Sequence, residues 1–168
     1  MQRWRALAAG AGLLVVVTGT ATHGETRLER GAYLVTTLGA CGNCHTTRNA
    51  DNRPVEGMEL AGGREFDIEI GHIVGPNVTP DKETGIGNWT EGQIVTALRN
   101  GKRPDGTIIG PPMPIEMYRN LSDRDAEAIA VYLKSLKPVR HAVARSQYKV
   151  TLPPNYGPLV GHVDEPDR

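Results

Sequence analysis

The sequence predicts an all-α domain in which three main helices are joined by long loops. Three segments carry apolar residues at helical spacing, and they begin near Leu28, Thr90 and Ser122. The stretches between them are rich in glycine and proline, which favour turns over further helices. The apolar inventory is modest and includes a single phenylalanine, Phe66. We therefore expect something other than side chains to fill part of the core.

The first 21 residues are predicted to be a secretory signal peptide. Arg3 and Arg5 precede a short apolar run over residues 6–17, and small and polar residues follow it. The run is shorter than the roughly 20 apolar residues that a membrane span needs. We expect cleavage after Ala21, with Gly24 as the second choice, and an uncleaved membrane anchor is the alternative. The mature protein is thus expected in a bacterial periplasm, in contact with a membrane only if this segment is retained.

The chain ends in a proline-rich segment, residues 139–168, that lacks helical periodicity. Such a composition favours an extended chain that is either disordered or laid along a partner. Its aromatic and leucine side chains, Tyr148, Leu152 and Tyr156, are candidates to pack on the domain or on another subunit. Its two histidines, His141 and His162, are expected to be solvated.

The two cysteines of the chain, Cys41 and Cys44, occur together in ACGNCHTTR and are followed directly by His45. A structural zinc site would need four ligands, and the other histidines are scattered singly. A thioredoxin-like pair belongs at a strand-to-helix junction in a βαβ pattern, which we do not find. These two interpretations remain as weaker alternatives. The pattern C-x-x-C-H is the attachment signature of haem c, in which each thiol bonds to one vinyl group and the histidine binds the iron. We predict one haem c, attached through Cys41 and Cys44, with His45 as its proximal ligand.

The second and third helices carry capping signals. Thr90 is the expected N-cap of the middle helix, Gln93 completes a capping box, and Gly101 ends the helix. Ser122 is the expected N-cap of the last helix, and Pro138 follows its end.

With these features the chain resembles the class I c-type cytochromes. More narrowly, it is similar to the monohaem modules in the cytochrome subunits of periplasmic alcohol, aldehyde and related dehydrogenases. The resemblance runs from about Leu28 to Pro138, and it implies the class I cytochrome c fold, in which the first and last helices cross beside the haem. We therefore interpret residues 22–138 as a cytochrome c domain that follows the signal peptide (1–21) and precedes the extended tail (139–168).

The resemblance also implies roles for residues on both faces of the haem. In the family, the carbonyl of a proline in a Gly-Pro pair accepts a hydrogen bond from the proximal histidine, and in IVGPNVTP the matching residue is Pro76, with a simple turn as the alternative. The family's sixth ligand comes from a loop before the last helix, and in GPPMPIEMYRNLS it is Met113. Met117, Met58, a histidine or an open site are the alternatives. Trp89 is expected to donate its indole N–H to a haem propionate, with ordinary core packing as the alternative.

A histidine and methionine ligand pair predicts an electron carrier. A thioether favours ferrous iron, and two filled axial positions leave no place for a substrate to bind. We expect the protein to carry single electrons from a periplasmic dehydrogenase to an oxidase or another cytochrome. It is then not itself an enzyme. It is either a free carrier or the electron-accepting subunit of a dehydrogenase. The alternative is a haem enzyme or gas-binding sensor with an open sixth position. With 19 basic and 19 acidic residues, the chain has no charge excess that would favour a nucleic-acid partner.

Overall fold

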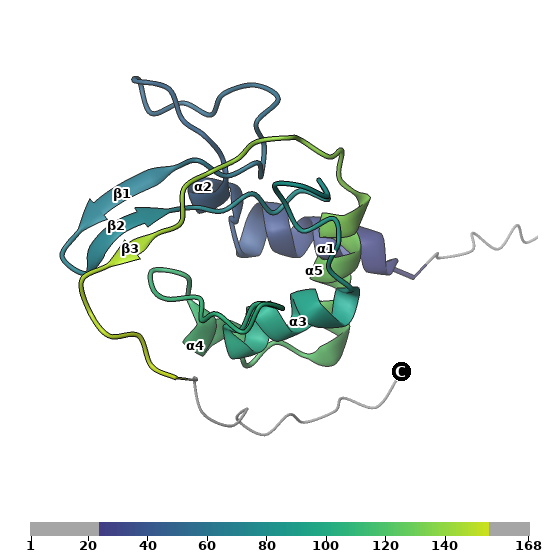
Figure 1. Cartoon of the computed structure of the whole chain (residues 1–168). Helices are drawn as coiled ribbons and strands as arrows, with labels where there is room; N and C mark the ends of the chain where they lie inside the picture. The colour runs from purple at the N-terminus through teal and green to yellow at the C-terminus, as the bar shows by residue number, and fades with distance from the viewer. Residues whose placement is uncertain (1–23, 155–168) are drawn as a thin grey trace, which may run out of the picture.

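The structure is a computed structural model that describes residues 24–154, and the expected signal peptide and residues 155–168 lie outside this range. In chain order, its elements are α1 (Arg27–Tyr33), the π-helix η1 (Leu34–Leu38), α2 (Gly42–His45), β1 (Glu65–Ile68), β2 (Gly71–Val74), α3 (Glu91–Asn100), α4 (Ile115–Tyr118), α5 (Asp123–Ser135) and β3 (Gln147–Tyr148) (Figure 1). Over the described range, no helix has the length and apolar character needed to cross a membrane.

The middle and last expected helices are α3 and α5, and their predicted caps are confirmed. Thr90 Oγ1 accepts a hydrogen bond from Gln93 N (3.2 Å), while the Gln93 side chain accepts one from Thr90 N (2.9 Å). Gly101 ends α3 in the left-handed conformation, with φ of 63°. Ser122 Oγ accepts from Asp125 N (3.0 Å) at the start of α5. These local signals therefore fix both helices where the sequence puts them.

The first expected helix does not run unbroken into the C-x-x-C-H motif. α1 passes into η1, whose last turn is closed by a hydrogen bond from Gly39 N to Leu34 O (2.7 Å). Ala40 then adopts a positive φ of 44°, which a right-handed helix cannot contain. The break separates the helix that packs in the core from the short turn, α2, that carries the motif.

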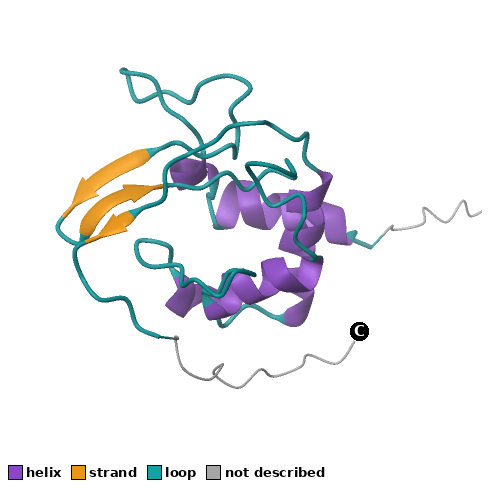
Figure 2. Cartoon of the chain, in the orientation of Figure 1, coloured by secondary structure: helices purple, strands orange, loops and turns teal. Residues whose placement is uncertain are grey.

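The predicted all-α class is too narrow, because the described residues also form a small antiparallel sheet (Figure 2). β1 pairs with β2 with Glu65 opposite Val74, and β2 pairs with β3 with Gly71 opposite Tyr148. Strands of two to four residues are too short for an alternating pattern to stand out. The third strand, β3, comes from the segment after α5, so its pairing with β2 joins parts of the chain that are far apart in the sequence.

The core lies where α1 and η1, α3 and α5 meet. These helices supply most of its large apolar side chains (Leu34, Val35, Ile94, Leu98, Ile129 and Leu133), and the loops add Leu60 and Ile86. As the resemblance implies, the first helix packs across the last one (Figure 1). Gly31 lies at the crossing, where a Cβ atom would overlap the Ala128 carbonyl oxygen and lie 2.7 Å from Tyr132 Cβ. The two helices reach this separation because position 31 has no side chain.

Replacing Gly31 with alanine is expected to lower the free energy of unfolding by about 1 to 3 kcal/mol, because backbone and side-chain atoms must shift to admit the methyl group. Urea unfolding of the variant followed by circular dichroism measures this loss. Gly92→Ala is the control, since its Cβ meets only Thr90 Oγ1 at 4.0 Å. Equal stability of Gly31→Ala and the unmodified protein would contradict the close crossing.

An ion pair joins the same two helices. Arg30 donates from Nε to Asp125 Oδ1 (2.8 Å) and from Nη2 to Oδ2 (3.1 Å), which is a bidentate arrangement. The hydrogen bonds from Arg30 lower the pKa of the Asp125 carboxyl below its usual value. A lowered pKa in the folded state stabilises the protein above the unfolded-state pKa of about 3.9, and this contribution is lost as the pH falls through the folded-state value.

Asp125→Asn is therefore expected to cost about 1 kcal/mol at neutral pH and less at about pH 3, which is below the unfolded-state pKa of about 3.9. Urea unfolding at both pH values measures the two differences. Asp51→Asn serves as the control, because the Asp51 carboxylate has no hydrogen-bond or ion-pair partner among residues 24–154. A cost that stays constant with pH would rule out the ion pair as its cause.

Candidate functional site

The C-x-x-C-H motif forms a single helical turn. The N–H groups of Cys44 and His45 both donate to the Cys41 carbonyl, at 3.1 and 2.9 Å. Both thiols are free and half-buried, and burial raises the pKa of the Cys41 thiol. One turn is the geometry in which the two residues between the cysteines span the separation of two haem vinyl groups.

His45 is buried, and its ring is held by one backbone carbonyl. Nδ1 lies 2.8 Å from the Pro76 carbonyl oxygen, which is the contact that the resemblance implies for Pro76. A carbonyl only accepts, so Nδ1 carries the proton and Nε2 keeps its lone pair. Burial lowers the pKa of His45, which favours this neutral form. A neutral imidazole with a free Nε2 lone pair is the form that binds a metal ion.

Two glycine-containing loops pack directly on the motif, and sequence reasoning missed one of them. A Cβ atom at Gly75 would overlap the Cys44 carbonyl oxygen, so only glycine fits there. The N–H of Gly62 donates to the His45 carbonyl (2.7 Å), and the N–H of Gly63 donates to the Gly75 carbonyl (2.8 Å). The glycine pair at 62–63, with φ of 80° and 85°, was the available sequence signal for this approach.

Asn77 is a second residue that sequence reasoning missed. Its side chain is buried and donates from Nδ2 to the Val139 carbonyl (2.8 Å) and to Thr84 Oγ1 (3.1 Å). Its Oδ1 accepts from the backbone N–H and the hydroxyl of Thr79 (2.9 and 2.7 Å). Asn77 therefore ties the loop that contains Pro76 to the segment that follows α5.

The expectation that His141 is solvated is wrong. The residue is half-buried, its Nδ1 lies 3.0 Å from the Ala61 carbonyl, and its N–H donates to Thr84 Oγ1 (2.9 Å). The partners lie 80 and 57 residues away along the chain, which is why no local pattern indicated them. His162 lies outside the described residues.

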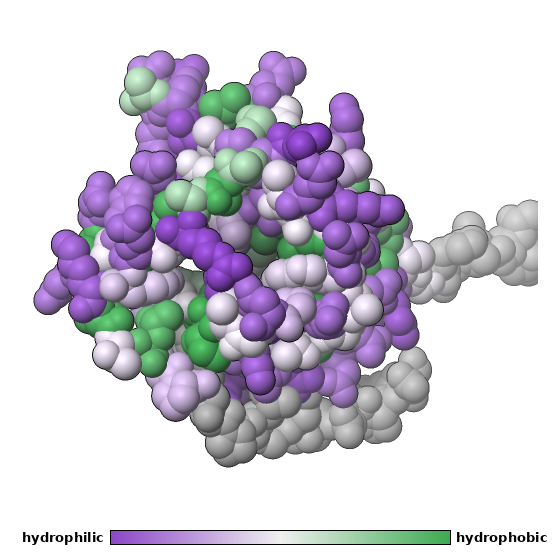
Figure 3. All heavy atoms as spheres, viewed as in Figure 1, coloured by the Kyte–Doolittle hydropathy of each residue, from purple (hydrophilic) through white to green (hydrophobic). Residues whose placement is uncertain are grey.

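Met113 is half-buried in the loop between α3 and α4 and packs against the same core as Cys41. Met117 is 72% exposed, and Met58 is half-buried in the loop that leads to the core residue Leu60. In Figure 1, the part of the chain around α2 and the part around α3 and α4 face each other across the middle of the molecule. Figure 3 shows the molecule from the same side, and its surface is hollowed near the centre beside hydrophobic residues. Among the described methionines, Met113 has the surroundings expected of an internal thioether ligand.

Trp89 is half-buried against the core just before α3. Its carbonyl accepts a hydrogen bond from Lys134 Nζ (3.0 Å), and the same ammonium group donates to the Gly87 carbonyl (2.7 Å). This arrangement accords with the core-packing alternative for Trp89, and its contact with a propionate stays a prediction.

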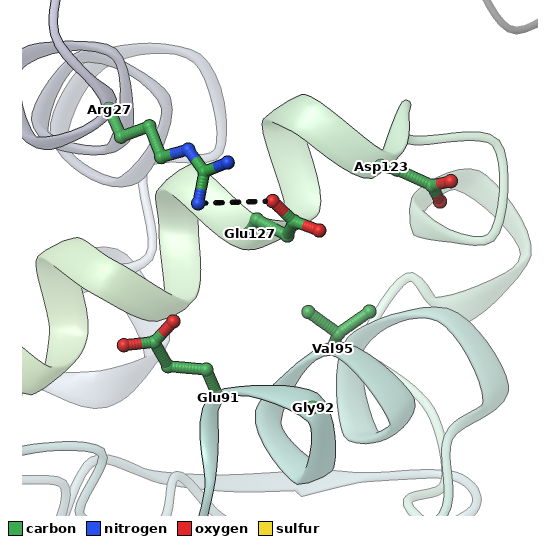
Figure 4. Close-up of a pocket in the computed structure, with 6 residues that line it drawn as sticks. All are labelled: Arg27, Glu91, Gly92, Val95, Asp123 and Glu127. Carbon is green, nitrogen blue, oxygen red and sulfur yellow. Dashed lines mark ion pairs between the residues drawn. The ribbon is translucent and has the colours of Figure 1, made fainter.

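A separate pocket lies between α1, α3 and α5, and Figure 4 shows the six residues that line it: Arg27, Glu91, Gly92, Val95, Asp123 and Glu127. Arg27 pairs with Glu127 across it at 3.3 Å, but both side chains are exposed, and such pairs stabilise little. None of the site residues predicted from the sequence lines this pocket. Within residues 24–154, no three His, Cys, Asp or Glu side chains gather as a metal cluster.

No protein-family model matches the chain. It is 40% identical over 142 residues to the cytochrome c subunit of alcohol dehydrogenase (quinone) from Gluconobacter oxydans (strain 621H), which covers 82% of this chain and 28% of that protein. It is 38% identical over 113 residues to the fructose dehydrogenase cytochrome subunit of Gluconobacter japonicus, covering 67% and 22% of the two chains. It is also 34% identical over 116 residues to the cytochrome c subunit of gluconate 2-dehydrogenase from Pantoea cypripedii, covering 68% and 24%.

The chain thus spans less than a third of the length of these curated relatives. The similarity to cytochrome subunits of dehydrogenases confirms the resemblance inferred from the sequence.

The close approach of Gly75 to the motif yields a further prediction. Gly75→Ala is expected to push the 75–76 backbone away from Cys44, which weakens the hydrogen bond from Gly63 N to Gly75 O. Hydrogen exchange at the Gly63 amide should then accelerate by roughly tenfold or more, while exchange in α5 stays unchanged. Gly42→Ala is the matched control in the motif itself, since its Cβ meets only Thr46 Oγ1 at 3.4 Å. Identical exchange in both variants would refute the packing account.

Proposed function

We propose that this chain, which is similar to the cytochrome c modules of dehydrogenase subunits, is a periplasmic monohaem electron carrier. When bound, haem c supplies a one-electron Fe(III)/Fe(II) couple. The observation that carries the proposal is the buried His45 ring, whose Nδ1 faces the Pro76 carbonyl and whose Nε2 keeps its lone pair, next to two free thiols on one helical turn.

The residues present fit this cofactor on chemical grounds. Cys41 and Cys44 offer two half-buried thiols for thioether bonds to the vinyl groups, and His45 offers a neutral imidazole. Met113 offers a thioether that packs against the same apolar core as Cys41. The hollowed face with hydrophobic residues beside it suits a flat apolar ring (Figure 3).

Each protein group then has one task. The Pro76 carbonyl holds the proton on His45 Nδ1, which orients the ring and raises the basicity of Nε2. The Met113 sulfur is a neutral, soft donor that favours the ferrous state. If His45 and Met113 both held the iron, no coordination position would be left for a substrate. The protein therefore accepts and passes on single electrons and transforms no substrate.

The partners follow from the relatives' names. Those proteins are cytochrome subunits of alcohol, fructose and gluconate dehydrogenases. We infer that a periplasmic dehydrogenase reduces this chain and that an oxidase or another cytochrome reoxidises it. The signal-like first 21 residues support a location outside the cytoplasm.

Optical spectra of Met113→Leu and Met117→Leu holoprotein test the ligand assignment. Leucine keeps a similar apolar volume at position 113 but removes the sulfur. We expect the weak methionine-to-ferric charge-transfer band in the unmodified protein and in the control Met117→Leu, whose side chain is exposed. Met113→Leu should lose the band and have a lower reduction potential. A band that persists in Met113→Leu would exclude Met113 as the sixth ligand.

A further inference from the structure

The segment after α5 is fastened beside the loop that holds His45. Ser146 Oγ accepts from Val74 N (3.0 Å) and donates to the Val74 carbonyl (3.2 Å), directly before Gly75 and Pro76. Further along, Lys149 N donates to the Ile70 carbonyl (2.9 Å), and residues 147–148 form β3 against β2. This segment therefore has a fixed position relative to the proximal loop.

The same segment also contacts the loop that carries Met113. The Tyr148 hydroxyl donates a hydrogen bond to the Pro111 carbonyl (2.9 Å), two residues before Met113. Gly110 is buried, and a Cβ atom there would lie 2.6 Å from Leu152 Cδ2 and 2.7 Å from Tyr148 Cζ. The half-buried ring of Tyr148 thus covers Gly110 while its hydroxyl holds the next residue.

The hydrogen bond to the Pro111 carbonyl holds this loop at a stretch of backbone that has no N–H groups. Residues 111 and 112 are both proline, and proline has no N–H with which to anchor the backbone. Both prolines are exposed, so packing does little to hold them in place. On the C-terminal side, the Met113 carbonyl accepts from Ile115 N (2.8 Å), which fastens the loop to α4. On the N-terminal side, Ile109 N donates to the Gly101 carbonyl (2.7 Å), and between that bond and Met113 the Tyr148 hydroxyl holds the Pro111 carbonyl.

We propose that Tyr148 is a positioning residue for Met113, and that its bond to Pro111 keeps the thioether where it can act as the sixth ligand. The proposal rests on the proposed function, because it assigns Tyr148 a task toward the Met113 ligand. Loss of the hydroxyl increases the fraction of protein in which the loop has moved and the sulfur has left the site. An added ligand that competes with Met113 then binds with higher apparent affinity, in proportion to that fraction.

The test compares holoprotein carrying Tyr148→Phe with the unmodified holoprotein, using imidazole as the competing ligand for the ferric site. Loss of the methionine-to-ferric band reports its binding. A single hydrogen bond predicts a roughly fivefold gain in apparent imidazole affinity for Tyr148→Phe. Hydrogen exchange at the Ile109 amide, which donates to the Gly101 carbonyl beside this loop, should accelerate by a similar factor, with exchange in α5 unchanged. Tyr33→Phe is the matched control, because Tyr33 is 44% exposed and its hydroxyl has no hydrogen-bond partner in the described part of the chain.

Three outcomes separate the possibilities. Faster exchange together with stronger imidazole binding in Tyr148→Phe alone supports the proposal. If Tyr148→Phe lowers the stability toward urea but leaves the imidazole affinity unchanged, the Tyr148 hydroxyl only stabilises the fold, and the proposal is overturned. If the methionine-to-ferric band survives in Met113→Leu, Met113 is not the sixth ligand. The proposed role of Tyr148 toward Met113 is then wrong as well, whatever the exchange rates in this loop.

Discussion

The structure depends on the contact between the backbone at Gly75 and Pro76 and the turn that carries Cys44 and His45. A side chain at position 75 would overlap the Cys44 carbonyl, so glycine lets the two backbones touch. The Pro76 carbonyl then lies 2.8 Å from His45 Nδ1 and decides which ring nitrogen carries the proton. The chemistry available at Nε2 is therefore a consequence of how two pieces of backbone pack.

Much of the remaining chain holds that contact in place. β2 ends at Val74 and delivers the next residue, Gly75, to the motif. Asn77 fixes the other side of the loop to Val139, just after the long helix α5 (Figure 1). Ser146 then returns to Val74 through two hydrogen bonds. The small sheet and the extended segment after α5 thus support one loop and, through it, one imidazole.

The sequence predicts those parts of the fold and site whose signals are local. The capping box of Thr90 and Gln93 lies within four residues, and C-x-x-C-H lies within five, so both can be read directly. The Pro76 contact came from family resemblance, because nothing in a Gly-Pro pair indicates a partner 31 residues away. The hairpin of β1 and β2 escaped prediction because its strands are too short to show an alternating pattern. The third strand and the role of Asn77 escaped it because both depend on the segment after α5 folding back by about 60 residues or more.

A redox titration of the purified holoprotein, followed by its optical spectrum and by exposure to carbon monoxide, tests the central claim most directly. An electron carrier ligated by His45 and Met113 should show one single-electron transition at positive potential, low-spin spectra in both states and no spectral change with carbon monoxide. A high-spin ferrous spectrum that shifts when carbon monoxide is added would reveal an open sixth position. That result would contradict the electron carrier and point to a haem enzyme or gas-binding sensor.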